Sequence, residues 1–131
     1  MKTLKTFAIL TLIFMFSSCA ISTKFPVSTV TPAADIVFSK SHDHNGNTKI
    51  KITAKNLASA DRIDPNQKMY VVWVITEKNE TRSIGVLKNR NVQTTALETL
   101  TPFKFTEVFI TAEDHTDVSY PSGIEISRIR F

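Results

Sequence analysis

The chain has 131 residues, of which 42% are hydrophobic, 9% aromatic and 21% charged; this composition is typical of one globular domain and excludes disordered and fibrous proteins. Its single cysteine excludes an internal disulfide and a cysteine-rich zinc site. The formal charge of +4 comes from basic residues scattered among acidic ones. Because no basic run follows the pattern of a phosphate backbone, we expect no nucleic-acid partner.

The first nineteen residues have the three-part plan of an export signal. Two lysines give a cationic start, residues 6–16 (TFAILTLIFMF) form an eleven-residue apolar run, and two serines precede Cys19. The apolar run is shorter than the roughly 20 residues that a spanning helix needs. One interpretation is a plain secretory signal with an incidental cysteine.

The end of this segment also resembles the signal of bacterial lipoproteins, in which a cysteine after small residues becomes the first residue of the mature protein and carries acyl chains such as palmitate. The resemblance implies a signal peptide over 1–18 and lipidation of Cys19, although Phe16 stands where that signal usually has leucine. It also implies a protein anchored to a membrane of the bacterial cell envelope. The lack of acidic residues directly after Cys19 favours the periplasmic face.

Residues 19–34 are expected to form the lipidated cysteine and a flexible linker. Residues 20–34 contain serine, threonine and two prolines without an apolar period. Pro26 and Pro32 lack a backbone donor and favour extended neighbours, as in a tether. The folded domain is therefore predicted to span 35–131.

From Asp35 onward the sequence predicts strands and no amphipathic helix. Asn45-Gly46 indicates a hairpin turn in which both residues have positive φ, and Ile50 and Ile52 alternate with lysines in the strand that follows it. Residues 68–76 (KMYVVWVIT) are apolar on both faces, which places this strand at the centre of a sheet. A polar excursion is expected at 56–67, and the strands at 35–41, 48–54, 68–76, 82–88, 92–99, 106–112 and 124–131.

Seven short strands predict an all-β fold, an antiparallel β-sandwich of immunoglobulin type without its disulfide. Trp73 is expected to reach across the core to the opposite sheet, facing away from Tyr70, Val72 and Val74. A ligand platform formed by Trp73 and Tyr70 is the alternative. Gly85 suggests a bulge or the close approach of a large neighbour, for which Trp73 is the candidate.

Two polar loops contain candidate metal ligands. His42 and His44 could share Cu²⁺ or Zn²⁺ if a third ligand came from elsewhere, and a solvated hairpin tip is the alternative. Residues 113–117 (EDHTD) hold three carboxylates suited to Ca²⁺, but the spacing and glycine of a calcium loop are missing. There is no Gly-x-Ser-x-Gly elbow and no glycine-rich phosphate loop, and we expect neither an enzyme nor a cofactor.

Four motifs follow one another in the second half of the chain: 70–74 (YVVWV), 84–87 (IGVL), 108–113 (VFITAE) and 121–123 (PSG). In this order they resemble the C-terminal extracytoplasmic domain of anti-sigma-K factors, over about residues 68–129. The resemblance implies the fold and not direct anti-sigma activity, because the sigma-binding region and membrane helix of those proteins have no counterpart in this sequence.

These observations predict a lipid-anchored, non-catalytic binding or scaffolding module of the bacterial envelope, with a protein partner. The alternative is a periplasmic lipoprotein that binds metal through His42 and His44.

Overall fold

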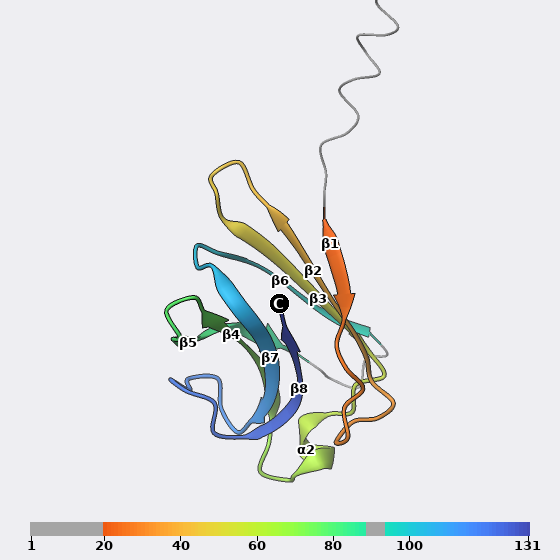
Figure 1. Cartoon of the computed structure of the whole chain (residues 1–131). Coiled ribbons are helices and arrows are strands. Elements are labelled where there is room, and N and C mark those ends of the chain that lie inside the picture. Colours follow the sequence, from red (N-terminus) through yellow and green to blue (C-terminus); the bar gives the residue numbers. More distant parts are fainter. Residues whose placement is uncertain (1–19, 89–93) are drawn as a thin grey trace, which may run out of the picture.

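The computed structural model describes residues 20–88 and 94–131, which form two four-stranded antiparallel sheets packed face to face (Figure 1). Sheet A has the order β1-β2-β3-β6, with β1 (Ile21–Lys24), β2 (Asp35–His42), β3 (Thr48–Lys55) and β6 (Thr94–Thr101). Sheet B has the order β5-β4-β7-β8, with β4 (Met69–Thr76), β5 (Thr81–Leu87), β7 (Phe105–Glu113) and β8 (Ile124–Arg130). The predicted all-β sandwich is confirmed, with eight strands in place of seven.

The main core lies between the two sheets and is built from alternate residues of each strand. In β3, Ile50 and Ile52 are fully buried while Lys49 and Lys51, which alternate with them, are exposed, as the alternation predicts. In the central strand β4, one face carries Tyr70, Val72 and Val74 into this core. Burial of each such aliphatic side chain contributes about 1.5–3 kcal/mol, and this stabilises the sandwich without disulfides.

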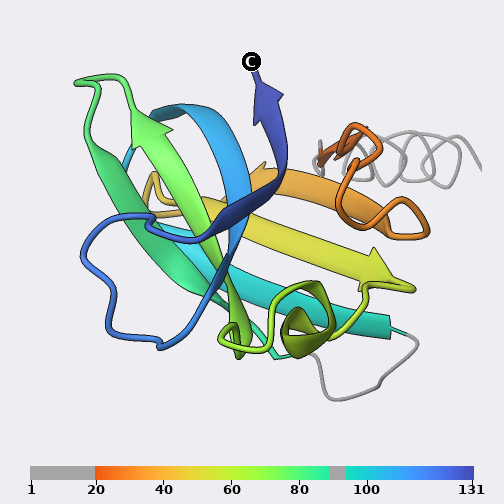
Figure 2. The ribbon, with the colours of Figure 1, turned by 90° about the horizontal axis from the view of Figure 1, so that it is seen from below.

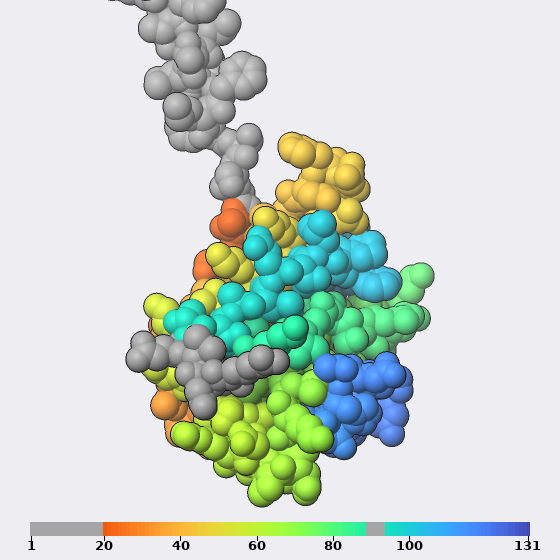
Figure 3. All heavy atoms as spheres, turned by 180° about the vertical axis from the view of Figure 1, so that it is seen from behind, coloured from red at the N-terminus to blue at the C-terminus, as the bar shows by residue number. Residues whose placement is uncertain are grey.

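The sandwich has two ends, which we call the hairpin end and the α2 end (Figure 3). The hairpin end comprises the start of β1, the β2–β3 loop (43–47), the β4–β5 turn (77–80), the β6–β7 loop (102–104) and Phe131. The α2 end comprises the segments 25–34, 56–68 and 114–123.

Residues 21–34 belong to the folded domain, so the flexible linker predicted over 20–34 is wrong. Strand β1 pairs with β2 at the edge of sheet A, and Phe25 directly after it is only 7% exposed and belongs to the main core. Ser127 Oγ donates a hydrogen bond to Pro26 O at 2.7 Å, which ties the segment to β8. An edge strand of four residues needs no apolar alternation, and the sequence pattern therefore did not reveal it.

The hairpin predicted at Asn45-Gly46 is confirmed, but its turn differs from the expected one. Of the Asn45-Gly46 pair, only Gly46 has positive φ, at +81°. The carboxylate of Asp43 instead shapes the loop, because its Oδ1 accepts hydrogen bonds from the backbone N–H groups of Asn45 (2.9 Å) and Asn47 (2.8 Å). Desolvation raises the pKa of Asp43, but the hydrogen bonds from Asn47 and Asn45 together outweigh it and hold this pKa below its usual value.

The polar excursion predicted at 56–67 contains one helical turn, α2 (Ala60–Ile63), which is too short to show an amphipathic period. Ala60 and Leu57 pack into the main core. The Tyr70 hydroxyl donates a hydrogen bond to Ala58 O, which holds the excursion against sheet B. Burial, together with the nearby charge of Asp61, raises the pKa of Tyr70 to about 12.

Ionisation of Tyr70 is expected to destabilise the fold at alkaline pH. Its pKa is about 12 in the folded chain against 10.0 for an unperturbed tyrosine, so its contribution to the free energy of unfolding is fully present below pH 10 and is lost as pH rises through 12. Between pH 10 and 12, the free energy of unfolding should fall less in Tyr70→Phe than in the wild type, as measured by unfolding followed by circular dichroism. Tyr120→Phe is the control because Tyr120 is 68% exposed. Equal pH profiles for the wild type and Tyr70→Phe would contradict the assignment.

Trp73 is fully buried, but it lies on the outer face of sheet B and not between the sheets. Its ring stacks on that of Phe109, with centroids 6.4 Å apart and planes 16° apart, and Val71 completes this outer cluster. The expected reach of Trp73 to the opposite sheet is therefore wrong. Its alternation with Tyr70 is right, because the two residues face opposite sides of β4.

The outer cluster is covered by the β7–β8 loop (114–123), which lies on the side of sheet B away from sheet A (Figure 2). Val118 of this loop packs against the cluster. At its edge, the guanidinium carbon of Arg128 lies 4.0 Å from the centroid of the Phe109 ring, and Arg128 also bonds to Glu107 and Glu125. Both faces of sheet B are thus covered.

The bulge expected at Gly85 is present, since Val72 pairs with Gly85 and Trp73 with Ser83, leaving Ile84 between them. The close neighbour of Gly85 is Leu97 of β6 and not Trp73. A Cβ at Gly85 would lie 2.8 Å from both methyl carbons of Leu97, so the missing side chain lets the edges of the two sheets meet.

Candidate functional site

Glu113, the last residue of β7, places a carboxylate in the interior. It is 1% exposed. Its Oε1 accepts hydrogen bonds from Thr111 Oγ1 (2.6 Å) and from the backbone N–H groups of Ser122 and Gly123 (3.1 Å each), and its Oε2 accepts one from Ser122 Oγ (3.0 Å). Trp73 Nε1 donates to Thr111 Oγ1 at 2.9 Å. We call this connected set the Glu113 latch.

The Glu113 latch closes the end of the β7–β8 loop over the outer cluster. At Gly123 a Cβ would lie 1.6 Å from Ala112 O, so only glycine fits where the loop returns to the sheet. The carboxylate uses its acceptor sites within the protein, and this arrangement supports a structural role for Glu113.

The calcium interpretation of 113–117 has no convergent ligands in the structure. Glu113 points inward, whereas Asp114 and Asp117 are exposed and Asp114 contacts the ring of His115. His42 and His44 are both exposed at the hairpin end, one at the end of β2 and one in the loop. Within residues 20–88 and 94–131, no group of three or more His, Cys, Asp or Glu side chains is placed to hold a metal ion. Metal binding by His42 and His44 stays a prediction.

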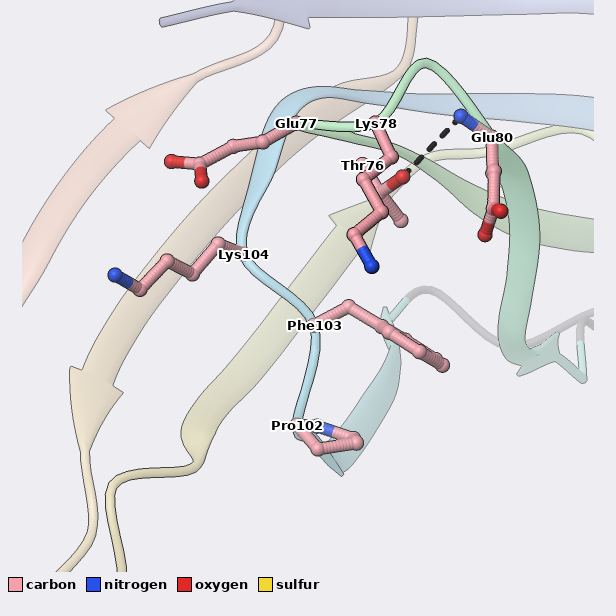
Figure 4. Close-up of a pocket in the computed structure, with 7 residues that line it drawn as sticks. All are labelled: Thr76, Glu77, Lys78, Glu80, Pro102, Phe103 and Lys104. Carbon is pink, nitrogen blue, oxygen red and sulfur yellow. Dashed lines mark hydrogen bonds between the residues drawn. The ribbon is translucent and has the colours of Figure 1, made fainter.

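A cleft of about 370 Å³ opens at the hairpin end between the β4–β5 turn and the β6–β7 loop (Figure 4). The Phe103 ring, 41% exposed, extends beneath Lys78 and Glu80, while the side chains of Glu77 and Lys104 project together on the other side of the loop. Its lining residues are Thr76, Glu77, Lys78, Glu80, Pro102, Phe103 and Lys104.

Local hydrogen bonds fix the β4–β5 turn. Thr76 N donates to Glu80 O (2.9 Å), and Glu80 N donates to Thr76 Oγ1 (3.2 Å). Asn79 takes the left-handed conformation that the turn needs, with φ of +64°. Thr76 is buried at the end of β4, so the turn begins from a fixed point.

The β6–β7 loop is held against this turn. Glu77 N donates to Lys104 O at 3.1 Å, which links the two walls of the cleft, and Phe103 N donates to Thr101 Oγ1 at 3.2 Å. The cleft is therefore preformed, and a ligand would meet little ordering cost on binding.

The lining combines an exposed aromatic ring with charges of both signs. Arg82 pairs with Glu80 (2.9 Å), and its guanidinium carbon lies 5.6 Å from the centroid of the Phe103 ring. Aromatic and arginine side chains commonly anchor protein interfaces. Such a surface suits a partner that offers an apolar group with charged flanks.

Sequence reasoning missed both the cleft and the Glu113 latch. The available signal for the cleft was an aromatic residue after proline in a short loop between two strands, at 101–104 (TPFK). Glu113 was interpreted as part of a polar loop because the acidic residues after it hid the end of β7.

Cys19, the predicted lipidation site, lies outside the described residues. In the part of the chain that the structure covers, no helix has the length and apolar character required to cross a membrane. No protein family, curated protein or solved structure matches the chain.

Proposed function

We propose that this chain is a lipid-anchored, non-catalytic binding module of the bacterial cell envelope, which faces the periplasm and binds a protein partner through the cleft at the hairpin end. The observation that carries the proposal is the preformed cleft, in which Phe103 is displayed between two loops joined by the Glu77–Lys104 hydrogen bond. The signal pattern that ends at Cys19 supports the location.

The fold that we propose is of immunoglobulin type, and the strand order supports it. In that fold strands A, B and E share one sheet while C, F and G share the other, with C′ added beside C in some members. Strands β2, β3 and β6 have the relation of A, B and E, and β5, β4, β7 and β8 that of C′, C, F and G. Strand β1 is an addition at the edge, and Trp73 faces away from the core. The resemblance to the anti-sigma-K extracytoplasmic domain stays a prediction.

The lipid anchor predicts a clear phenotype for Cys19→Ser. Without the sulfur that accepts the lipid, the exported protein should remain unprocessed or leave the membrane fraction. Fractionation and mass spectrometry of the wild type and Cys19→Ser measure this directly, with Ser18→Ala as the control. Normal processing and membrane recovery of Cys19→Ser would refute lipidation.

The cleft predicts a crosslink through its aromatic residue. A photoreactive phenylalanine analogue placed at position 103 in intact cells should capture a discrete envelope protein, because Phe103 is the exposed apolar group of the lining. The same analogue at Tyr120, which is 68% exposed at the α2 end, is the control. Phe103→Ala should also reduce recovery of the captured protein by pull-down. Equal capture from both positions, or from neither, would exclude the cleft as the binding site.

A further inference from the structure

We infer that the hairpin end of the domain rests on the surface of the bilayer that holds the lipid anchor. The inference deepens the proposed function, because it places the cleft beside the bilayer and restricts the partner to a protein that reaches the membrane surface, and it rests on lipidation of Cys19. Its starting point is the distance along the chain, because only Ala20 separates Cys19 from Ile21, the first residue of β1. Two residues span at most about 7 Å, so a lipidated Cys19 keeps the start of β1 at the headgroup layer.

Strand β1 is fixed in the fold and transmits this constraint to the whole domain. All four of its residues pair with β2, with Ile21 opposite Lys40 and Lys24 opposite Val37. Phe25 then enters the core. The strand enters from the hairpin end and runs toward the α2 end (Figure 1). The anchor therefore lies at the hairpin end, with no flexible tether of the kind that the sequence predicted.

The surface of the hairpin end suits a lipid headgroup layer. Ile21, Leu100 and Phe131 are 56%, 57% and 50% exposed there, and Lys40 Nζ lies 4.3 Å from the centroid of the Phe131 ring. Apolar groups beside lysines are typical of interfacial membrane contacts. Exposed apolar side chains also occur at the α2 end, at Val27, Val30 and Tyr120, so apolar exposure alone does not select an end. The short chain distance between Cys19 and Ile21 selects the hairpin end.

Two lysines at opposite ends provide a matched test. Lys104 is an exposed residue of the cleft lining at the hairpin end, and Lys68 is exposed at the α2 end just before β4. An eight-residue strand such as β4 is about 26 Å long, which separates the two ends well beyond the headgroup layer. Lys104→Cys and Lys68→Cys in the full chain are labelled with a polarity-sensitive thiol fluorophore and reconstituted in vesicles of phosphatidylethanolamine and phosphatidylglycerol with nitroxide-labelled lipids.

We expect the label at position 104 to shift its emission to the blue and to be quenched by the nitroxide lipids, while the label at 68 keeps the emission seen in water. Equal emission and quenching at both positions would overturn the inference. A shift at 104 that occurs in native membranes and is absent from these vesicles would assign the contact to the protein partner; this result would overturn the inference while supporting the cleft as the binding site. The unmodified chain checks the premise, because labelling of Cys19 would show a free thiol and refute the lipid anchor itself.

Discussion

Replacement of Glu113 by alanine is expected to lower the free energy of unfolding by roughly 2–4 kcal/mol, because hydrogen bonds to a charged group contribute about 1.5–3 kcal/mol each and the loop amides can be partly resolvated. The change removes the acceptor of four hydrogen bonds, from Thr111, Ser122 (two) and Gly123. The β7–β8 loop should then open locally. Chemical denaturation measures the loss, and hydrogen exchange of the Ser122 and Gly123 amides measures the opening.

Two variants separate the latch from a general charge effect. Glu113→Gln retains an oxygen at the position that accepts three of the four hydrogen bonds, and it should be less destabilising than Glu113→Ala. Glu125→Ala removes an exposed carboxylate that pairs with Arg128, and exposed pairs contribute only about 0–1 kcal/mol. A loss for Glu113→Ala no larger than that for Glu125→Ala would contradict the Glu113 latch.

Trp73→Ala is expected to cost about 3–5 kcal/mol, the usual range for a buried large aromatic. The substitution leaves a cavity beside Phe109 and removes the N–H that bonds to Thr111. Domains commonly have about 5–15 kcal/mol of stability in total, so this variant should be marginally folded near physiological temperature. Thermal unfolding followed by circular dichroism measures the effect.

The intrinsic fluorescence of the wild type provides a second check, since Trp73 is the only tryptophan. Its native emission should be blue-shifted and should move to the red on unfolding. Tyr120→Ala, at an exposed site, should change stability by no more than about 0.5 kcal/mol. Native emission equal to that of the unfolded chain would place Trp73 in solvent and contradict the outer cluster.

The strands could be predicted from the sequence where one local signal was sufficient. The alternation of Ile50 and Ile52 with lysines predicted β3, and the continuous apolar run predicted the central position of β4. The Asn45-Gly46 pair located the β2–β3 hairpin, although the carboxylate of Asp43 determines its turn. In these cases side-chain period and turn chemistry act within a few residues of each other.

The remaining features depend on contacts between distant segments. Alternation showed that Trp73 and Tyr70 face opposite sides of β4, but only the cover supplied by the β7–β8 loop makes the outer side dry enough for a tryptophan. Glu113 is recognisable as a latch only once the backbone of Ser122 and Gly123 lies beside it. The cleft likewise forms only where the turn of the β4–β5 hairpin meets the β6–β7 loop, which crosses between the sheets; the two meet at Glu77 and Lys104.

The hydrogen bond between Pro26 and Ser127 joins residues 101 positions apart. Because closure of long loops must precede such contacts, this topology has a high contact order and belongs with the β-sandwiches that fold in milliseconds to seconds. The contact that ties the segment after β1 to β8 can form only after β8 has been added to sheet B. Until β1 and this segment are in place, the outer edge of β2 is open to pairing with other chains.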